Sequence, residues 1–168
     1  MTMSVQAAHS DLVFHRGTAT WCALAEICLS VAPEVCSACK HWYTNDGDGL
    51  GAEEASKLAD ALELRLSDGT IDQWISKKIS FAKSLPDEPC PNCGGTGVRT
   101  DKVGIKFGFD KRKIDDQNHP RFGQAGYCNG CRGYGFRRPF SAYYPLEDSK
   151  IVAELVTFLK ASGGFRIW

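Results

Sequence analysis

Three segments in the first half of the chain place apolar residues at helical spacing. The first, "TATWCALAEICLSVA", predicts a helix that begins at Thr18 or Thr20, either of which could cap it, and ends at about residue 32, before Pro33. Its apolar face consists of Trp21, Leu24, Ala25, Cys28 and Leu29. Because residues three and four positions apart share one helix face, we expect this face to lie against a core.

The second and third segments predict helices over 52–66 and 70–85. Two glutamates near the start of the second helix favour its positive end, and an Asp-Gly pair supplies its stop. The inward positions are Ala55, Leu58, Leu62 and Leu66 in one helix, and Ile71, Trp74, Ile75, Ile79 and Phe81 or Ala82 in the other. Prolines at 86 and 89 then make 85–89 the clearest boundary in the chain.

Residues 90–140 are dense in glycine and lack helical periodicity. The stretch "VGIKFGF" (103–109) alternates as a short strand would, and the polar stretch "DKRKIDDQNHPRFG" (110–123) predicts a loop or mobile hairpin. Helical spacing returns over 146–161, and the final "FRIW" predicts a strand or a hydrophobic tuck. The inward residues of this last helix are Ile151, Leu155, Phe158 and Leu159.

Composition and charge are those of a soluble globular protein, with 43% hydrophobic and 24% charged residues among 168. The formal net charge is zero, but residues 85–145 carry 10 basic and 6 acidic side chains. Four thiolates around one zinc ion would contribute a charge of about −2 and offset much of this excess, so the charge alone does not require nucleic acid. The N-terminus lacks the pattern of a signal peptide, which predicts a cytoplasmic protein without a membrane segment.

Two segments 38 residues apart, "CPNCGGTG" (90–97) and "CNGCRGYG" (128–135), share the pattern C-x-x-C-x-G-x-G. Two cysteines separated by two residues can face one ion when the backbone between them turns tightly, and the following glycines permit such turns. Two such knuckles supply the four ligands of a closed tetrahedral zinc site. The predicted ligands of one zinc ion are Cys90, Cys93, Cys128 and Cys131.

The repeat resembles the cysteine-rich zinc-finger module of the DnaJ family of cochaperones, in which four such repeats form two zinc sites and help engage unfolded polypeptides. Two repeats match here, which implies one site over about 50 residues. A J-domain requires His-Pro-Asp, whereas this chain has His119, Pro120 and Arg121 within the insert, so the resemblance implies no J-domain activity. The flanking regions resemble uncharacterised bacterial proteins, and that resemblance implies no activity.

Together these patterns predict an α+β fold, a mainly α-helical core with an inserted zinc-knuckle module of short β-strands. The expected domains are a helical region (1–89), the DnaJ-like knuckle insert (90–140), and a C-terminal helix and tail (141–168) that packs on the helical region. With all four positions filled, the zinc would have no place for a reactive water, which disfavours hydrolysis. We therefore expect a binding protein in which the zinc makes a surface rigid for a macromolecular partner. A protein is the favoured partner, and a nucleic acid is the second choice.

Two alternative functions stay open. The C-x-x-C pairs could serve a thiol-disulfide redox or holdase-type protein. Aromatic residues interleaved with basic residues (Arg132, Arg137, Arg138 and Lys111 to Lys113) could stack on the bases of a single-stranded nucleic acid. We expect instead that most of these rings pack around the glycine-rich knuckles, and exposed rings would suit a protein partner before a nucleic acid. We find no nucleophile motif, no phosphate loop and no set joining His9, His15, His41 or His119 to a serine or aspartate. The aromatic candidates are Trp42, Tyr43, Phe107, Phe109, Tyr127, Tyr134, Phe136, Tyr143, Tyr144 and Trp168.

Two further metal sites are considered. Cys22, Cys28, Cys36 and Cys39, with His41, could form a second site, but no glycine follows Cys39, and core packing explains these cysteines as well. The stretch "TNDGDGLGAEEA" resembles a calcium-binding loop, yet it has alanine where the bidentate glutamate belongs, so an acidic turn explains it without a metal.

Overall fold

The structure, a computed structural model that describes residues 2–168, has the α+β fold that the sequence predicts. The described residues form two compact units. We call residues up to 80 together with 144–168 the sheet unit, and residues 81–143 the knuckle unit. The division of the chain at 89 and 140 into domains stays a prediction.

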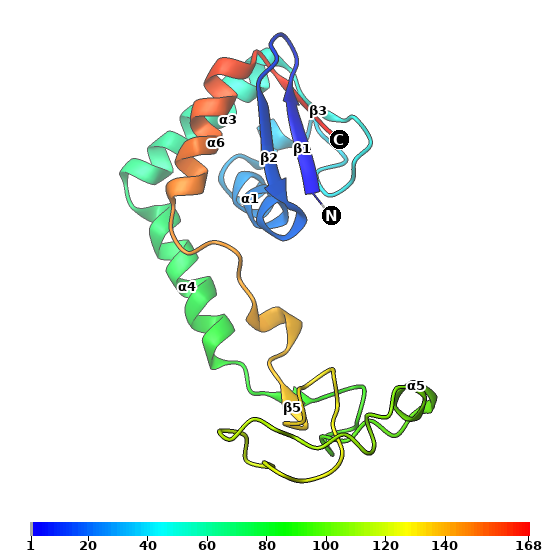
Figure 1. Cartoon of the computed structure of the whole chain (residues 1–168). Coiled ribbons are helices and arrows are strands. Elements are labelled where there is room, and N and C mark those ends of the chain that lie inside the picture. The colour runs from blue at the N-terminus through cyan, green and yellow to red at the C-terminus, as the bar shows by residue number, and fades with distance from the viewer. Residues whose placement is uncertain (1) are drawn as a thin grey trace. The chain divides into compact units, whose positions relative to one another are not determined.

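The sheet unit contains a four-stranded antiparallel sheet in the order β2-β1-β6-β3 (Figure 1). The N-terminal and C-terminal strands are neighbours in it, with Val5 opposite both Phe14 and Ile167. The strands are β1 (Thr2–Ala7), β2 (Val13–Gly17), β3 (Gly49–Leu50) and β6 (Phe165–Ile167). The predicted C-terminal strand is thus confirmed, and the hairpin of β1 and β2 was missed.

The missed hairpin carries a weak alternating signal. Met3 and Val5 on β1 and Phe14 on β2 are buried, while their neighbours His15 and Val13 are exposed. Alternation over strands this short is a small signal, because only two or three inward positions define it. These residues are buried in the core that the sheet shares with the helices, and only the folded chain supplies that core.

The helices of the sheet unit follow the predicted segments closely. They are α1 (Thr18–Val31), the short α2 (Pro33–Cys36), α3 (Ala52–Ser67), α4 (Thr70–Ser84) and α6 (Lys150–Ser162). Three details differ from the predictions. Gly17, rather than Thr18 or Thr20, is the N-cap of α1, and α6 begins at Lys150 rather than at 146. The sequence pattern does not predict the short helix α2, because Pro33 indicates only the end of the first helix.

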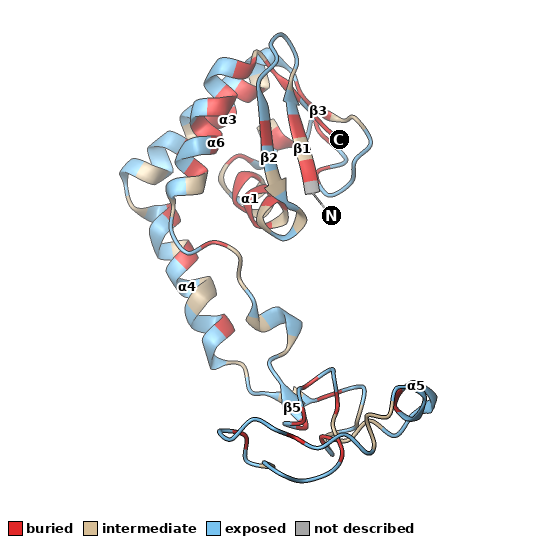
Figure 2. Cartoon of the chain, in the orientation of Figure 1, coloured by how far each residue is buried: buried red, intermediate tan, exposed pale blue. Residues whose placement is uncertain are grey.

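One hydrophobic core joins the sheet to these helices, and buried residues concentrate there in Figure 2. The rings of Trp21 and Trp42 stack with centroids 6.0 Å apart, and the Trp21 indole donates a 2.7 Å hydrogen bond to the Trp42 carbonyl. Trp42 also meets Phe165 of β6 edge to face. The tail therefore lies in the core as part of the sheet.

The knuckle unit contains β4 (Glu88–Pro89) paired with β5 (Phe136–Arg137), the short helix α5 (Lys102–Lys106) and the 3-10 turn η1 (Phe140–Ala142). The predicted strand over 103–109 is wrong, since α5 occupies its first half. The Asp101 carboxylate accepts a 2.7 Å hydrogen bond from Gly104 N–H, and this cap outweighs a short alternating pattern.

The polar stretch 110–123 forms a hairpin-like loop. Lys113 and Ala125 form an isolated antiparallel bridge, and the Gly123 N–H donates to the Ile114 carbonyl at 2.8 Å. This loop brings residues 112–119 back to the second knuckle.

Candidate metal centre

Four cysteine side chains from the two knuckles meet in the knuckle unit. The Sγ atoms of Cys90, Cys93, Cys128 and Cys131 all lie within 4.8 Å of one another. The Cys90 and Cys128 sulfurs are 3.8 Å apart, and those of Cys93 and Cys131 are 3.7 Å apart. The structure thus brings together the four cysteines that the sequence selects as ligands.

The sulfur spacing is compatible with a metal site and too long for disulfides. A tetrahedral site with metal–sulfur bonds near 2.3 Å places its sulfurs about 3.8 Å apart, whereas disulfide sulfurs are about 2.0 Å apart. All eight cysteines, which lie in the described part of the chain, are free thiols. The cluster could hold one metal ion, and four sulfur donors favour zinc, copper(I) or iron over harder cations.

The two knuckles have the same backbone conformation. Residues 38 positions apart share left-handed φ angles, and the pairs are Gly94 and Arg132 (58° and 52°), Gly95 and Gly133 (92° and 89°), and Gly97 and Gly135 (75° and 86°). In each repeat the last glycine donates its N–H to the second cysteine, at 3.3 Å from Gly97 to Cys93 and 3.2 Å from Gly135 to Cys131. These bonds direct N–H dipoles at two of the four sulfurs.

The glycines also pack the two knuckles against each other reciprocally. A Cβ on Gly97 would lie 2.3 Å from the Gly133 carbonyl oxygen, and one on Gly135 would lie 2.3 Å from the Gly95 carbonyl oxygen. Both separations are far below van der Waals contact. The glycines of the x-G-x-G part of the motif therefore meet two requirements. They permit positive φ angles, and they let the two backbones approach closely across the site.

The thiols of the cluster differ in acidity. Burial works to raise the pKa of the Cys93 thiol, but N–H donation from Gly97 and hydrogen bonds from neighbouring thiols bring this pKa below its usual value. Burial raises the pKa of Cys131 to about 12, and it also raises the pKa of Cys128. A cation that binds here at neutral pH must displace protons from these thiols.

The other four cysteines do not form a second cluster with His41 among the described residues. Cys28, Cys36 and Cys39 are buried in the core of the sheet unit, and burial raises the pKa of Cys36 to about 12. The carbonyl oxygen of Cys36 accepts a hydrogen bond from the Trp42 indole at 3.1 Å. Core packing, the simpler of the two hypotheses, accounts for these three cysteines, and Cys22 is half-buried.

The acidic stretch resembling a calcium loop forms a turn instead. The Asp48 carboxylate accepts N–H bonds from Lys40 and Gly49 at 2.7 and 2.8 Å and from His41 at 3.1 Å. Asp46 accepts from Thr44 at 2.6 Å. Because backbone N–H groups already occupy the Asp48 oxygens, this carboxylate shapes the chain between α2 and β3.

Most aromatic candidates of the knuckle unit are exposed, so the expectation that they pack around the knuckles is wrong for them. Phe107, Tyr134 and Phe136 expose half or more of their surface. Phe122 and Phe140, which are not among the predicted candidates, do so too. The glycine backbones fill the space between the knuckles themselves, and this leaves the rings outside. By contrast, Trp42 is buried and Tyr144 is half-buried in the sheet unit, where the Tyr144 ring meets Trp74.

Cations and rings converge beside the second knuckle in a cleft of about 200 Å³, which we call the basic cleft. Arg112, Lys113 and Arg132 line it together with Tyr134 and other residues of 112–134. The sequence shows these cations interleaved with aromatic residues but gives no sign that they meet in one cleft. They meet because the loop closed by the Lys113–Ala125 bridge places residues 112–119 against the second knuckle.

Two histidines have polar partners that the sequence did not suggest. Ser4 Oγ and His15 Nδ1 are 2.9 Å apart as a cross-strand pair, and His41 Nδ1 is 3.3 Å from the Asp46 carboxylate. Both pairs are exposed, and neither histidine has both a nucleophile and a carboxylate among its contacts in residues 2–168. They do not form a catalytic triad.

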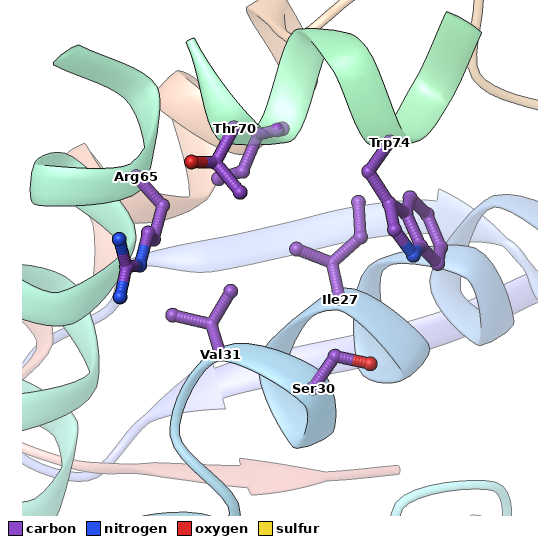
Figure 3. A pocket seen from close by; sticks show the side chains of 7 residues that line it. Ile27, Ser30, Val31, Arg65, Thr70 and Trp74 are labelled. Atoms are coloured by element: carbon purple, nitrogen blue, oxygen red, sulfur yellow. The ribbon is translucent and has the colours of Figure 1, made fainter. Parts of the chain in front are cut away.

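The sheet unit contains an apolar pocket of about 460 Å³ between α1 and α4 (Figure 3). It is lined by Ile27, Ser30, Val31, Arg65, Thr70, Ile71 and Trp74. Arg65 is paired with Asp68 at 2.9 Å, and the Trp74 ring meets Lys78 and Tyr144. The pocket could accept an apolar group, but its lining offers no acid–base pair or activated nucleophile for a reaction.

The chain matches no protein-family model, and the searches of curated proteins and of solved structures gave no match either. None of the helices within residues 2–168 combines the length and the apolar character that crossing a membrane requires.

Proposed function

We propose that this protein binds one zinc ion through Cys90, Cys93, Cys128 and Cys131, and that the ion fixes a rigid surface for binding another macromolecule. The convergence of the four sulfurs on one point carries the proposal. When bound, zinc supplies four strong bonds that cross-link segments 38 residues apart. Since protein ligands fill all four positions, its role is structural rather than hydrolytic.

The interior of the knuckle unit supports this role. Its buried hydrophobic cluster consists of Cys90, Cys128 and Cys131 with Cys93 packed against them, whereas the sheet unit has an extensive apolar core. So small a cluster contributes little hydrophobic stabilisation, and small domains of this kind usually depend on a metal or disulfides. The exposed rings and cations around the site give the resulting surface its binding character.

The test is the zinc content of purified protein with a matched pair of variants. We expect one zinc per chain in the native protein, with much weaker retention after Cys93→Ser and full retention after Cys22→Ser, because Cys22 lies outside the cluster. A native protein that folds normally without stoichiometric metal would refute the proposal.

The redox and holdase alternative is separated by the same sample. Zinc that survives mild peroxide, with four thiols of the cluster unreactive to titration, excludes disulfide cycling. Loss of zinc together with formation of two disulfides would favour it instead. Suppression of aggregation of an unfolded model protein, lost after chelation, would favour the holdase activity that the DnaJ-like repeat suggests.

A further inference from the structure

The basic cleft contains three features that the metal centre does not explain. The first is Arg132, the one non-glycine residue with positive φ among the described residues. The equivalent position of the first knuckle is Gly94, with nearly the same φ. An L-residue is strained in this region, so glycine would suit the fold better. An arginine at a position where glycine fits the backbone better points to a use for its side chain.

The second feature is the set of charges. Arg112, Lys113 and Arg132 line the cleft against two aspartates, Asp115 and Asp116. One oxygen of the Asp116 carboxylate already accepts a hydrogen bond, from the Asn118 N–H at 2.9 Å. The surrounding knuckle unit carries 11 basic and 6 acidic residues, and it stays net positive after the charge of about −2 that a zinc-loaded cluster contributes, so the cleft lies in a positive region. Such a field attracts anions.

The third feature is the pair of aromatic walls. Tyr134 is 52% exposed, and its ring lies 4.1 Å, centroid to centroid, from that of His119. The Arg112 guanidinium lies 4.6 Å from the centre of the Tyr127 ring. An exposed ring held in place by a second ring offers a flat platform beside the cations.

His119 is held firmly in this wall. It is 5% exposed, and its Nδ1 accepts the Arg121 N–H at 3.0 Å, so the ring proton is on Nε2. Nε2 has no hydrogen-bond partner among the described residues. Buried donors are seldom left without an acceptor, and this one lies on the wall of the basic cleft.

We propose that the basic cleft binds a nucleotide of a single-stranded nucleic acid. Arg112, Lys113 and Arg132 contact the phosphate, and a base stacks on Tyr134. Cations next to an exposed ring match a phosphate next to a base, and stacking tolerates any base. An acidic peptide would use the cations and leave the ring without a matching group. This inference rests on the proposed function, since the second knuckle, which the zinc fixes, positions Arg132 and Tyr134.

The experiment measures fluorescence anisotropy of labelled single strands, oligodeoxythymidine and oligouridine, with full-length protein of known zinc content. We expect binding that weakens as salt rises from about 50 mM to about 200 mM. A labelled polyglutamate peptide of equal charge should bind much more weakly. No salt-sensitive binding of either strand, or tighter binding of the peptide, overturns the inference.

Variants test the cleft itself. Arg132→Gly removes a cation while relieving the positive φ, so the protein should fold at least as well, bind about fivefold to tenfold more weakly and lose about 0.7 from the salt slope. Tyr134→Ala should weaken binding at least about fivefold. Lys102→Gln, a charge-matched change on α5 outside the cleft, should change the affinity less than about twofold. Equal losses for Lys102→Gln and Arg132→Gly would overturn the proposal.

The metal content separates the two proposals. If zinc is stoichiometric and no strand binds, the zinc proposal stands and the cleft inference fails. If strands bind through Arg132 and Tyr134 in protein that is folded without zinc, the cleft inference stands and the zinc proposal fails.

Discussion

At the residue scale, the glycines of the knuckles matter as much as the cysteines. The Gly97 and Gly135 N–H groups each donate to a sulfur, and their missing side chains allow the opposite carbonyl to approach. Gly94 has the same positive φ but open space around its Cα. A side chain at Gly94 would therefore cause backbone strain alone, whereas one at Gly97 or Gly135 would also collide with a carbonyl oxygen.

This difference predicts unequal effects of adding one methyl group. Gly135→Ala should lower zinc affinity at least tenfold, because a Cβ 2.3 Å from the Gly95 carbonyl oxygen costs about 2 kcal/mol or more in the bound form. Gly94→Ala should lower it by about 1 kcal/mol or less, as the arginine at the equivalent position indicates. Competition with a chromogenic chelator measures both, and equal affinities would contradict the packing argument.

Asp48 makes the stability of the sheet unit depend on pH. Partial burial works to raise its pKa, but the N–H groups of Gly49, Lys40 and His41 hold the pKa of this carboxyl below its usual value. A group with a lowered pKa in the folded state stabilises the protein above its unfolded pKa of about 4, and this stabilisation is lost as the pH falls through the folded value.

Asp48→Asn should therefore destabilise the protein by about 1–3 kcal/mol at pH 7 and reduce the loss of stability below about pH 4. Urea unfolding at several pH values, followed by tryptophan fluorescence, measures this. Asp60→Asn, at an exposed position on α3, is the control and should leave the profile unchanged. If the stability of Asp48→Asn falls with pH in parallel with that of the native protein, the three N–H bonds do not favour the ionised carboxylate over the protonated one.

At the element scale, α3 and α6 pack closely and form a large part of the helical core. Leu58 and Leu62 of α3 and Leu155 and Leu159 of α6 are all buried. Leu64 on the opposite face of α3 is 59% exposed. The helix thus contains a buried and an exposed leucine of equal helix propensity.

Leu58→Ala should destabilise the sheet unit by about 2–5 kcal/mol, since it removes buried methyl groups and leaves a cavity. Leu64→Ala should cost less than about 1 kcal/mol. The free energy of unfolding in urea is the measurement. Similar costs for the two variants would mean that α3 is not packed with this face inward.

At the scale of the whole molecule, the two units draw their stability from different sources. The sheet unit has a continuous apolar core, whereas the buried cluster of the knuckle unit consists of cysteines. Removing the proposed zinc ion with a chelator should therefore destabilise the knuckle unit and leave the sheet unit folded. Cooperative loss of both would be expected only if the sheet unit depended on the knuckles for its core.

Hydrogen exchange with and without a strong chelator tests this. Amides of residues 81–143 should lose protection, while those of α3, α6 and β1 should keep theirs. Loss of protection in β1 as well would contradict the prediction that the two units are stabilised independently.

The sequence by itself determined the helices and the cysteine cluster. Four helical segments have apolar faces that continue over many residues, so their patterns are strong. Two copies of C-x-x-C-x-G-x-G identify the four cysteines that come together, because the motif depends on local spacing. The errors fall on short elements. Two or three alternating positions defined β1 and the predicted strand at 103–109, and a single cap at Asp101 decided the latter.

Only the tertiary structure decided which distant residues meet. The sheet pairs β1 with β6 across almost the whole chain, and the reciprocal glycine contacts join knuckles 38 residues apart. The basic cleft likewise depends on a loop that returns residues 112–119 to Arg132 and Tyr134. Periodicity and spacing report local geometry, whereas these contacts depend on long-range packing, which no local pattern contains.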